Sequence, residues 1–286
     1  MGIILEIVKS IVYGVIQGIT EWLPISSTGH MILVNTWLPL RVFESTADNI
    51  AFWEMYKVVI QFGSILAVAV QYFRRLNPFN PNLKESGKRR IWRLWILIII
   101  ATIPAGIAGV LLDDLIDEHL STPIVVAIAL IVYGILFIVI ENREKEIEVE
   151  SVNGITPKKA LSIGAFQMLA LIPGTSRSGS TILGSTLLGL SRTAAAEFSF
   201  FMAMPVMLGA SILKLFKLSA PITFGGILVL LVGMITAFIV SVYVIRIFVD
   251  YLRKNDFKLF GYYRIILGVI ILILALVHLL PEGLTA

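Results

Sequence analysis

The sequence contains no cysteine among its 286 residues. It therefore forms no disulfide bond and binds no metal through thiolates. Its three histidines form no HExxH or His-rich pattern, which excludes the common zinc motifs. Charged residues are also scarce: they make up 15% of the chain, whereas about a quarter is usual in soluble domains. This shortage excludes an ordinary water-soluble globular protein.

Apolar residues replace the missing charges, at 57% of the chain with a mean hydropathy of +0.91. A bilayer is spanned by about 20 apolar residues. Six stretches are close to or above this length: 51–73, 94–112, 123–140, 198–218, 224–249 and 260–280. The sequence therefore predicts an all-α integral membrane protein with six full transmembrane helices. We expect no cleavable leader, because Glu6 and Lys9 interrupt the first apolar stretch and no small-residue cleavage site follows it.

Four further apolar segments are shorter or interrupted, and they form two pairs: 3–23 with 27–40, and 160–172 with 179–190. Pro- and Ser-rich breaks separate the members of each pair and cannot continue a helix. Non-helical backbone at membrane depth is tolerated only where protein buries it or water fills a cavity. We therefore predict two re-entrant helix–loop–helix hairpins. The alternative is that 3–23 and 160–172 are ordinary full spans.

The two pairs belong to an internal repeat. Gly14-x-x-Gln17 and Ser26 recur as Gly164-x-x-Gln167 and Ser176, an offset of 150 residues. Membrane folds with such repeats often build a site where the repeats meet. The predicted repeats cover about 1–140 and 160–286 within one transmembrane domain, 1–286, and a charged loop, 141–159, joins them.

Loop charge predicts the orientation of each repeat. Lys and Arg mark cytoplasmic loops, and they are concentrated at 74–93, 141–159 and 253–258, whereas 113–119 holds neither. The first three segments are therefore expected inside, and 113–119 and both termini outside. The two repeats then have inverted topology, and the hairpins enter the membrane from opposite sides.

Polar residues gather at the two breaks, in segments 17–30 and 173–181. At membrane depth such residues are costly and are functional candidates by default. Each second helix begins at its break, so its free N–H groups and positive dipole end favour an anion, phosphate above all. Any single hydroxyl there is better explained as an N-cap, but three at each break exceed what a cap needs. The hydroxyls are those of Ser26, Ser27, Thr28, Ser176, Ser178 and Ser180.

Three other side chains add reactive chemistry. Arg177 has a planar fork of donors that suits phosphate; the alternative is a buried ion pair with Glu21, which is also a plausible resting state of the site. Glu21, one turn after Gln17, is a candidate general base or a ligand for Mg²⁺ or Ca²⁺; otherwise it is a carboxylate that bonds to the loop. His30 follows Ser27 by three residues, so both are expected to face one point, as a nucleophile and a proton carrier do.

The motifs Gln17-x-x-x-Glu21, Pro24-Ile-Ser-Ser-Thr-Gly-His-Met31 and Pro173-Gly-x-Ser-Arg-Ser-Gly-x-Thr181 resemble the signature of a known family. It is the undecaprenyl pyrophosphate phosphatase family of the bacitracin-resistance type, and the likeness covers nearly the whole chain. The resemblance implies a cell-membrane hydrolase that removes the terminal phosphate of the C55 isoprenoid pyrophosphate carrier. It also implies dependence on a divalent cation and a site that opens to the outer face.

Residue by residue, the resemblance places the family's acidic motif on Gln17 and Glu21. It places the serine–histidine motif on Ser26, Ser27 and His30, and the phosphate-binding motif on Ser176, Arg177 and Thr181. Many members of the family have Glu at the position of Gln17. Glu21 is therefore the one acidic ligand that this motif offers to a cation.

The expected reaction is hydrolysis of a lipid phosphoanhydride, in which positioning and charge neutralisation dominate. Ser27 is the expected nucleophile, and the alternatives are His30 and a water molecule activated by Glu21. Small residues, namely Gly14, Gly18, Ala105 and Gly109, permit close helix packing or a groove for the lipid tail. An inverted-repeat transporter or lipid-phosphate flippase is the alternative, although transport does not require Glu, Ser and His within ten residues.

The expected partners are the isoprenoid pyrophosphate and membrane lipids. The net charge of +4 comes with short basic loops between spans, so it does not indicate nucleic-acid binding. The sequence leaves a monomer and a homodimer open.

Overall fold

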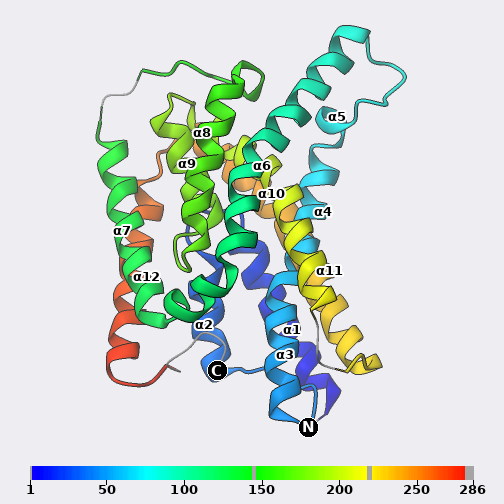
Figure 1. Ribbon diagram of the computed structural model, residues 1–286, viewed down its shortest axis with the longest axis vertical. Helices are drawn as coiled ribbons and strands as arrows, with labels where there is room; N and C mark the ends of the chain where they lie inside the picture. Colours follow the sequence, from blue (N-terminus) through cyan, green and yellow to red (C-terminus); the bar gives the residue numbers. More distant parts are fainter. Residues whose placement is uncertain (1, 144–145, 218–220, 281–286) are drawn as a thin grey trace.

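The computed structural model describes residues 2–143, 146–217 and 221–280, without the side chains of residues 113, 114 and 117 (Figure 1). The regular structure in this part of the chain is helical, and its one β-type contact is an isolated bridge between Val149 and Leu190. The prediction of an all-α protein is confirmed. Its twelve α-helices are α1 Ile3–Thr20, α2 Ser27–Trp37, α3 Thr46–Val59, α4 Gln61–Gln71, α5 Phe73–Leu76, α6 Glu85–Leu120, α7 Pro123–Glu141, α8 Pro157–Met168, α9 Arg177–Leu187, α10 Arg192–Phe216, α11 Phe224–Leu252 and α12 Lys258–Leu276.

Seven helical segments in the described part of the chain are long and apolar enough to cross a membrane. Six of them overlap the six predicted spans, with α3 and α4 forming a single segment, Thr46–Gln71. The seventh is α1, which the sequence analysis placed inside a hairpin. Its 18 residues extend about 27 Å at 1.5 Å per residue, so by length and composition α1 is also a candidate span.

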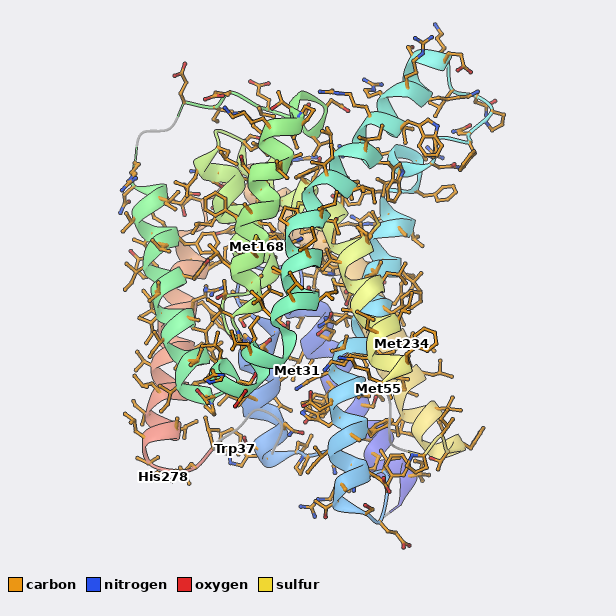
Figure 2. The ribbon with its side chains drawn as sticks, viewed as in Figure 1. Met31, Trp37, Met55, Met168, Met234 and His278 are labelled. Carbon is orange, nitrogen blue, oxygen red and sulfur yellow. The ribbon has the colours of Figure 1, made fainter. Side chains whose placement is uncertain are left out.

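The two predicted pairs of shorter segments are present as separate helices with breaks between them. α1 and α2 flank the first break, while α8, a 3₁₀ turn at Leu169–Leu171 and α9 flank the second. Figure 2 shows Met31 of α2 and Met168 of α8 in the middle part of the long axis, whereas Trp37 lies toward one end. Ser26 and Thr175, at the turns of the two breaks, are each 1% exposed, so both turns lie inside the helical bundle.

Glycines bring several helices into backbone contact. A Cβ added at Gly14 would lie 2.6 Å from the Gly233 carbonyl oxygen of α11, and one at Gly164 would lie 2.3 Å from the Ala101 carbonyl oxygen of α6. Gly18 likewise faces α11. Of the two uses that the sequence allowed for Gly14 and Gly18, the structure shows close helix packing.

Candidate active site

The two breaks meet at a buried ion pair. Nη2 of Arg177 donates to Oε1 of Glu21 at 3.0 Å, although the two residues are 156 positions apart. Their side chains are 11% and 7% exposed. Glu21 directly follows α1 and Arg177 begins α9, so the pair joins the two halves of the chain. The ion pair that the sequence offered as an alternative role for Arg177 is therefore present.

The second carboxylate oxygen of Glu21 accepts two further hydrogen bonds. Nε2 of Gln17 donates to Oε2 at 3.0 Å, and Oγ of Ser27 donates to the same oxygen at 3.3 Å. Gln17 reaches Glu21 because it lies one helical turn earlier. The Ser27 hydroxyl is thus hydrogen-bonded to a carboxylate, which is the arrangement of a nucleophile beside a base.

Two serines cap the helices that begin at the breaks. The side chain of Ser26 accepts from the Gly29 N–H of α2 at 3.4 Å, and that of Ser176 accepts from the Gly179 N–H of α9 at 3.2 Å. Both serines have left-handed backbone, with φ of 71° and 70°. The two breaks therefore have the same local geometry at positions 150 residues apart. In this state both hydroxyls act as N-caps.

Other hydroxyls hold the breaks together. Oγ of Ser178 donates to the carbonyl oxygens of Glu21 and Leu23, at 3.1 and 3.2 Å. Oγ1 of Thr181 donates to the Arg177 carbonyl at 2.8 Å and pairs with Oγ of Ser199 at 2.7 Å. Nη1 of Arg177 donates to the Ser199 carbonyl at 2.8 Å. Ser199, on α10, therefore orients Arg177, a role that the sequence analysis did not assign to it.

A cavity of about 220 Å³ opens beside the ion pair. It has room for several water molecules. α10 and α6 supply part of an apolar wall, through residues such as Met207 and Ala105. The polar side chains that line it are Glu21, Ser27, Thr28, Gln61, Gln167, Ser176 and Arg177. The cavity therefore places the Ser27 hydroxyl, a carboxylate and a guanidinium group around one space.

His30 is turned toward α12. Its Nδ1 lies 2.7 Å from the Ser26 carbonyl oxygen and its Nε2 lies 2.6 Å from the Tyr263 hydroxyl. The His30 and Tyr263 rings stack, with an interplanar angle of 7°. Since a carbonyl only accepts, Nδ1 carries a proton. Both ring nitrogens have partners other than Ser27, so the expected convergence of His30 and Ser27 is not formed in this state.

Two buried polar side chains at the breaks were missed from the sequence. Arg264 of α12 is fully buried and donates to backbone carbonyls of both breaks. An arginine inside the predicted span 260–280 was the available signal. Gln167 is 2% exposed, and neither atom of its amide has a hydrogen-bond partner in the part of the chain that the structure describes. Its signal was the match to Gln17 in the repeat.

The oxygen donors near Glu21 are compatible with a hard cation. In the described residues no group of three or more His, Cys, Asp or Glu side chains is placed to bind a metal. The amide oxygen of Gln17 is buried without a partner there, next to the Glu21 carboxylate that its nitrogen contacts. Carboxylate and amide oxygens suit Mg²⁺ and Ca²⁺, which take further ligands from phosphates or water.

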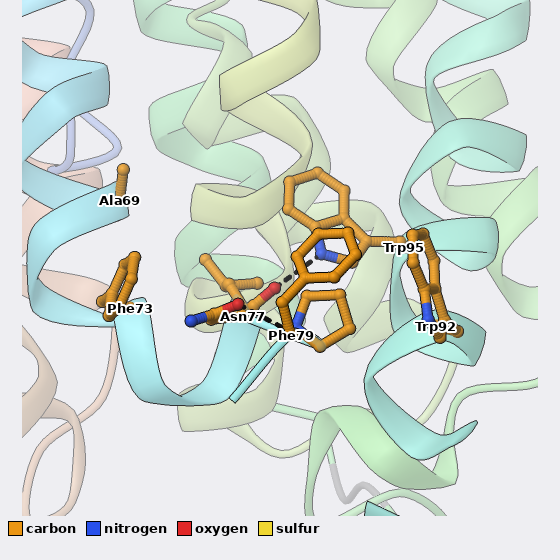
Figure 3. A pocket seen from close by; sticks show the side chains of 8 residues that line it. Ala69, Phe73, Asn77, Phe79, Trp92 and Trp95 are labelled. Carbon is orange, nitrogen blue, oxygen red and sulfur yellow. Dashed lines mark hydrogen bonds between the residues drawn. The ribbon is translucent and has the colours of Figure 1, made fainter. Parts of the chain in front are cut away.

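The end of the molecule that contains α5 has a second ion pair and a second cavity, which differ from those at the breaks. Nη1 and Nη2 of Arg75 form a two-pronged ion pair with Glu197, at 2.6 and 2.9 Å, and these hydrogen bonds raise the pKa of Arg75. Nearby, a cavity of about 320 Å³ is lined mainly by aromatic rings, among them Phe73, Trp92 and Trp95 (Figure 3). No titratable side chain lines this second cavity. Of the two cavities, the one beside the ion pair is the one lined by charged and hydroxyl side chains of the breaks.

A bundle of membrane-length helices that encloses hydrogen-bonded Glu, Arg and Ser side chains defines a polytopic membrane protein with a buried polar site. Residues 10–270 match the family described as Bacitracin resistance protein BacA. The chain belongs to this family.

The sequence similarity to known relatives covers nearly the whole length of this chain. The chain is 55% identical over 269 residues to Undecaprenyl-diphosphatase 1 of Clostridioides difficile (strain 630), a match that covers 94% of this chain and 96% of that protein. It is 50% identical over 274 residues to Undecaprenyl-diphosphatase of Enterococcus faecalis, with 94% and 97% covered. The corresponding protein of Desulfitobacterium hafniense (strain DSM 10664 / DCB-2) is 51% identical over 273 residues, with 94% and 96% covered.

Proposed function

We propose that this protein is a membrane-embedded undecaprenyl-diphosphatase. It hydrolyses undecaprenyl diphosphate, or a related polyprenyl diphosphate, to the monophosphate and inorganic phosphate. This reaction recycles the lipid carrier of cell-wall glycan synthesis and gives bacitracin resistance. The names and full-length similarity of the relatives support the activity. The observation that carries the proposal is the contact of Glu21 with both Ser27 and Arg177 where the two breaks meet.

The diphosphate binds between the N-termini of α2 and α9. Their N–H groups and dipoles favour an anion, and Arg177 donates to the phosphoryl oxygens through its fork. When Arg177 turns to the substrate, Glu21 loses its ion-pair partner and becomes free to accept a proton. The supplementary donors to the diphosphate are Thr28 and Ser176, which line the cavity. Gln17, Ser26, Ser178 and Thr181 bond to other protein groups in this state and become donors only if they turn toward the cavity.

Ser27 is the proposed nucleophile. Its oxygen attacks the terminal phosphorus while Glu21 takes its proton, the bond from that phosphorus to the bridging oxygen breaks, and undecaprenyl monophosphate leaves. Water then hydrolyses the phosphoserine and releases phosphate. His30 protonates the leaving group or activates this water, which requires its Nε2 to exchange the Tyr263 hydroxyl for the reacting group. The same release makes Nε2 available in the rival scheme, in which His30 is the nucleophile.

A divalent cation, Mg²⁺ or Ca²⁺, is part of the proposal. Glu21 and the amide oxygen of Gln17 are the protein groups that would hold it, and the diphosphate would supply further oxygens. For Glu21 this role is the alternative to taking the Ser27 proton. Such an ion neutralises negative charge on phosphoryl oxygens.

We further propose that the two helix pairs are re-entrant hairpins in an inverted-topology repeat. The matching φ angles and caps of Ser26 and Ser176 support the repeat, and the loop charges support the inversion. α1 then forms the first half of a hairpin despite its length. In this arrangement the two halves, 1–140 and 160–286, form one domain whose site opens to the outer face of the cell membrane.

The test is phosphate release from undecaprenyl diphosphate by the purified protein in detergent, with and without a chelator. Detergent removes the second compartment, so a transporter or flippase without hydrolytic activity releases no phosphate. We expect release by the wild-type protein, and Ser27→Ala to abolish most of it. Equal turnover of both proteins would reject Ser27 as the nucleophile, and no turnover by the wild type would reject the enzyme.

A further inference from the structure

Arg264 connects the two breaks through three backbone carbonyls. Its Nη1 donates to the Pro24 oxygen at 3.0 Å, and its Nη2 donates to the oxygens of Gly174 and Thr175, each at 2.9 Å. Pro24 belongs to the first break and the other two residues to the second. One guanidinium group therefore sets the spacing of the backbone segments that carry Ser27 and Arg177.

Close helix packing places Arg264 at this point. A Cβ added at Gly134 of α7 would lie 2.7 Å from the carbonyl oxygen of Gly261 of α12, so the two backbones are in contact. The ring of Tyr133, also on α7, lies 5.5 Å from Cζ of Arg264 and forms a cation–π contact. The arginine side chain is 0% exposed. Its position is thus determined by α7 on one side and by the two breaks on the other.

The charge of Arg264 has no carboxylate partner among the described residues. Arg177 pairs with Glu21 and Arg75 pairs with Glu197, whereas the hydrogen bonds of Arg264 all go to neutral carbonyls. A buried charge without a counter-charge is costly, at membrane depth most of all. Since Glu21 balances Arg177, these three side chains together carry one net positive charge, which an anionic ligand would offset.

We propose that Arg264 is a positioning residue of the site. It holds the two breaks in the geometry that faces the diphosphate, and its unbalanced positive charge favours binding of the anionic group. This inference rests on the proposed function and assigns a role that the sequence motifs did not indicate. The competing explanation is that Arg264 only stabilises the fold.

Two variants separate geometry from charge. Arg264→Lys keeps the charge but has one ammonium group in place of a fork that spans three carbonyls. Arg264→Gln keeps a donor and removes the charge. The matched control is Arg253→Gln, at an exposed arginine whose ion-pair partner among the described residues is Asp250, also at the surface. For each protein we would measure the melting temperature, kcat and KM with undecaprenyl diphosphate, and the protection against thermal unfolding that inorganic pyrophosphate provides.

We expect Arg264→Lys to lower kcat about tenfold or more, while protection by pyrophosphate stays close to that of the wild type. Arg264→Gln should lower kcat and should also raise, by about tenfold or more, the pyrophosphate concentration that gives the same thermal protection. Arg253→Gln should change neither quantity. If both Arg264 variants keep wild-type kcat per folded molecule and wild-type protection, the role is structural and the inference is wrong.

Gly179→Ala tests the same geometry with the arginine in place, should the Arg264 variants not fold. Its Cβ would lie 2.9 Å from Nη1 of Arg264, so the guanidinium group must shift while its charge remains. We expect a lower kcat with pyrophosphate protection retained; an unchanged kcat would overturn the positioning role. Protection also separates this inference from the proposed reaction. If wild-type protein releases no phosphate but pyrophosphate protects it through Arg264, the reaction is wrong and the anion site stands.

Discussion

Gln167→Leu should make the protein more stable, although it removes a buried polar side chain. The Gln167 amide is buried, and neither of its polar atoms has a hydrogen-bond partner within the described residues. Its side chain lines the cavity beside Glu21, so the prediction holds for an amide to which no water in that cavity bonds. A buried donor or acceptor left unsatisfied costs about 1–3 kcal/mol, and an apolar side chain of similar shape avoids that cost. Leucine has a similar size. We therefore expect a gain of about 1–2 kcal/mol, which is a rise in melting temperature of about 2–8 °C at about 2–4 °C per kcal/mol for a chain of this size class.

The repeat supplies the matched control. Gln17 occupies the equivalent position in the first half, but its Nε2 donates to the buried Glu21 carboxylate at 3.0 Å. Hydrogen bonds to charged groups contribute about 1.5–3 kcal/mol, so Gln17→Leu should lower the melting temperature. The assay is thermal unfolding of the purified proteins in the same detergent. If both variants shift the melting temperature in the same direction by similar amounts, the inferred difference between the two amides is wrong.

Further predictions concern catalysis, topology and packing. Ser27→Ala should reduce phosphate release at least about a hundredfold in a folded protein, whereas Ser26→Ala, which removes a cap, should cost about 1 kcal/mol of stability and hurt turnover less. Arg177→Lys should fold but lose most activity, because it loses the bidentate fork; near-normal turnover would contradict a role in phosphate binding. A single cysteine at Gly87 should resist an impermeant thiol reagent in intact cells, and labelling there would reject the proposed inversion. Gly134→Leu should prevent normal folding, seen as loss of monodisperse protein, since α7 and α12 contact through their backbones.

The local sequence was sufficient to predict the helices and the breaks. Every predicted apolar run lies mainly in helical structure, because a run of this length satisfies its backbone groups within the membrane only as a helix. The bounds are less exact: α6 extends nine residues before and eight residues beyond the predicted 94–112. Pro24 and Pro173 stop helices for a local steric reason. The matching motifs at Ser26 and Ser176 likewise predicted breaks of one kind, and both adopt the same left-handed cap.

Contacts between distant segments required the tertiary structure. The partners of His30 are the Ser26 carbonyl and Tyr263, and a ring that follows Ser27 by one turn has several rotamers that spacing alone cannot distinguish. Arg264 lies between the two breaks only because α12, to which it belongs, packs closely against α7. From sequence, that arginine is a charge near the end of a span, where lysines and arginines often extend to the membrane surface.

The sequence by itself therefore determined the membrane class, the helices, the two polar breaks and the residues proposed for the site, because these depend on local composition and spacing. Only the tertiary structure decided which of those residues touch: that Glu21 bonds to Arg177, Gln17 and Ser27 together, and that Gln167 has no such partner. The physical reason is that hydrogen bonds act over about 3 Å, and separations of that size between segments 150 residues apart are set by helix packing.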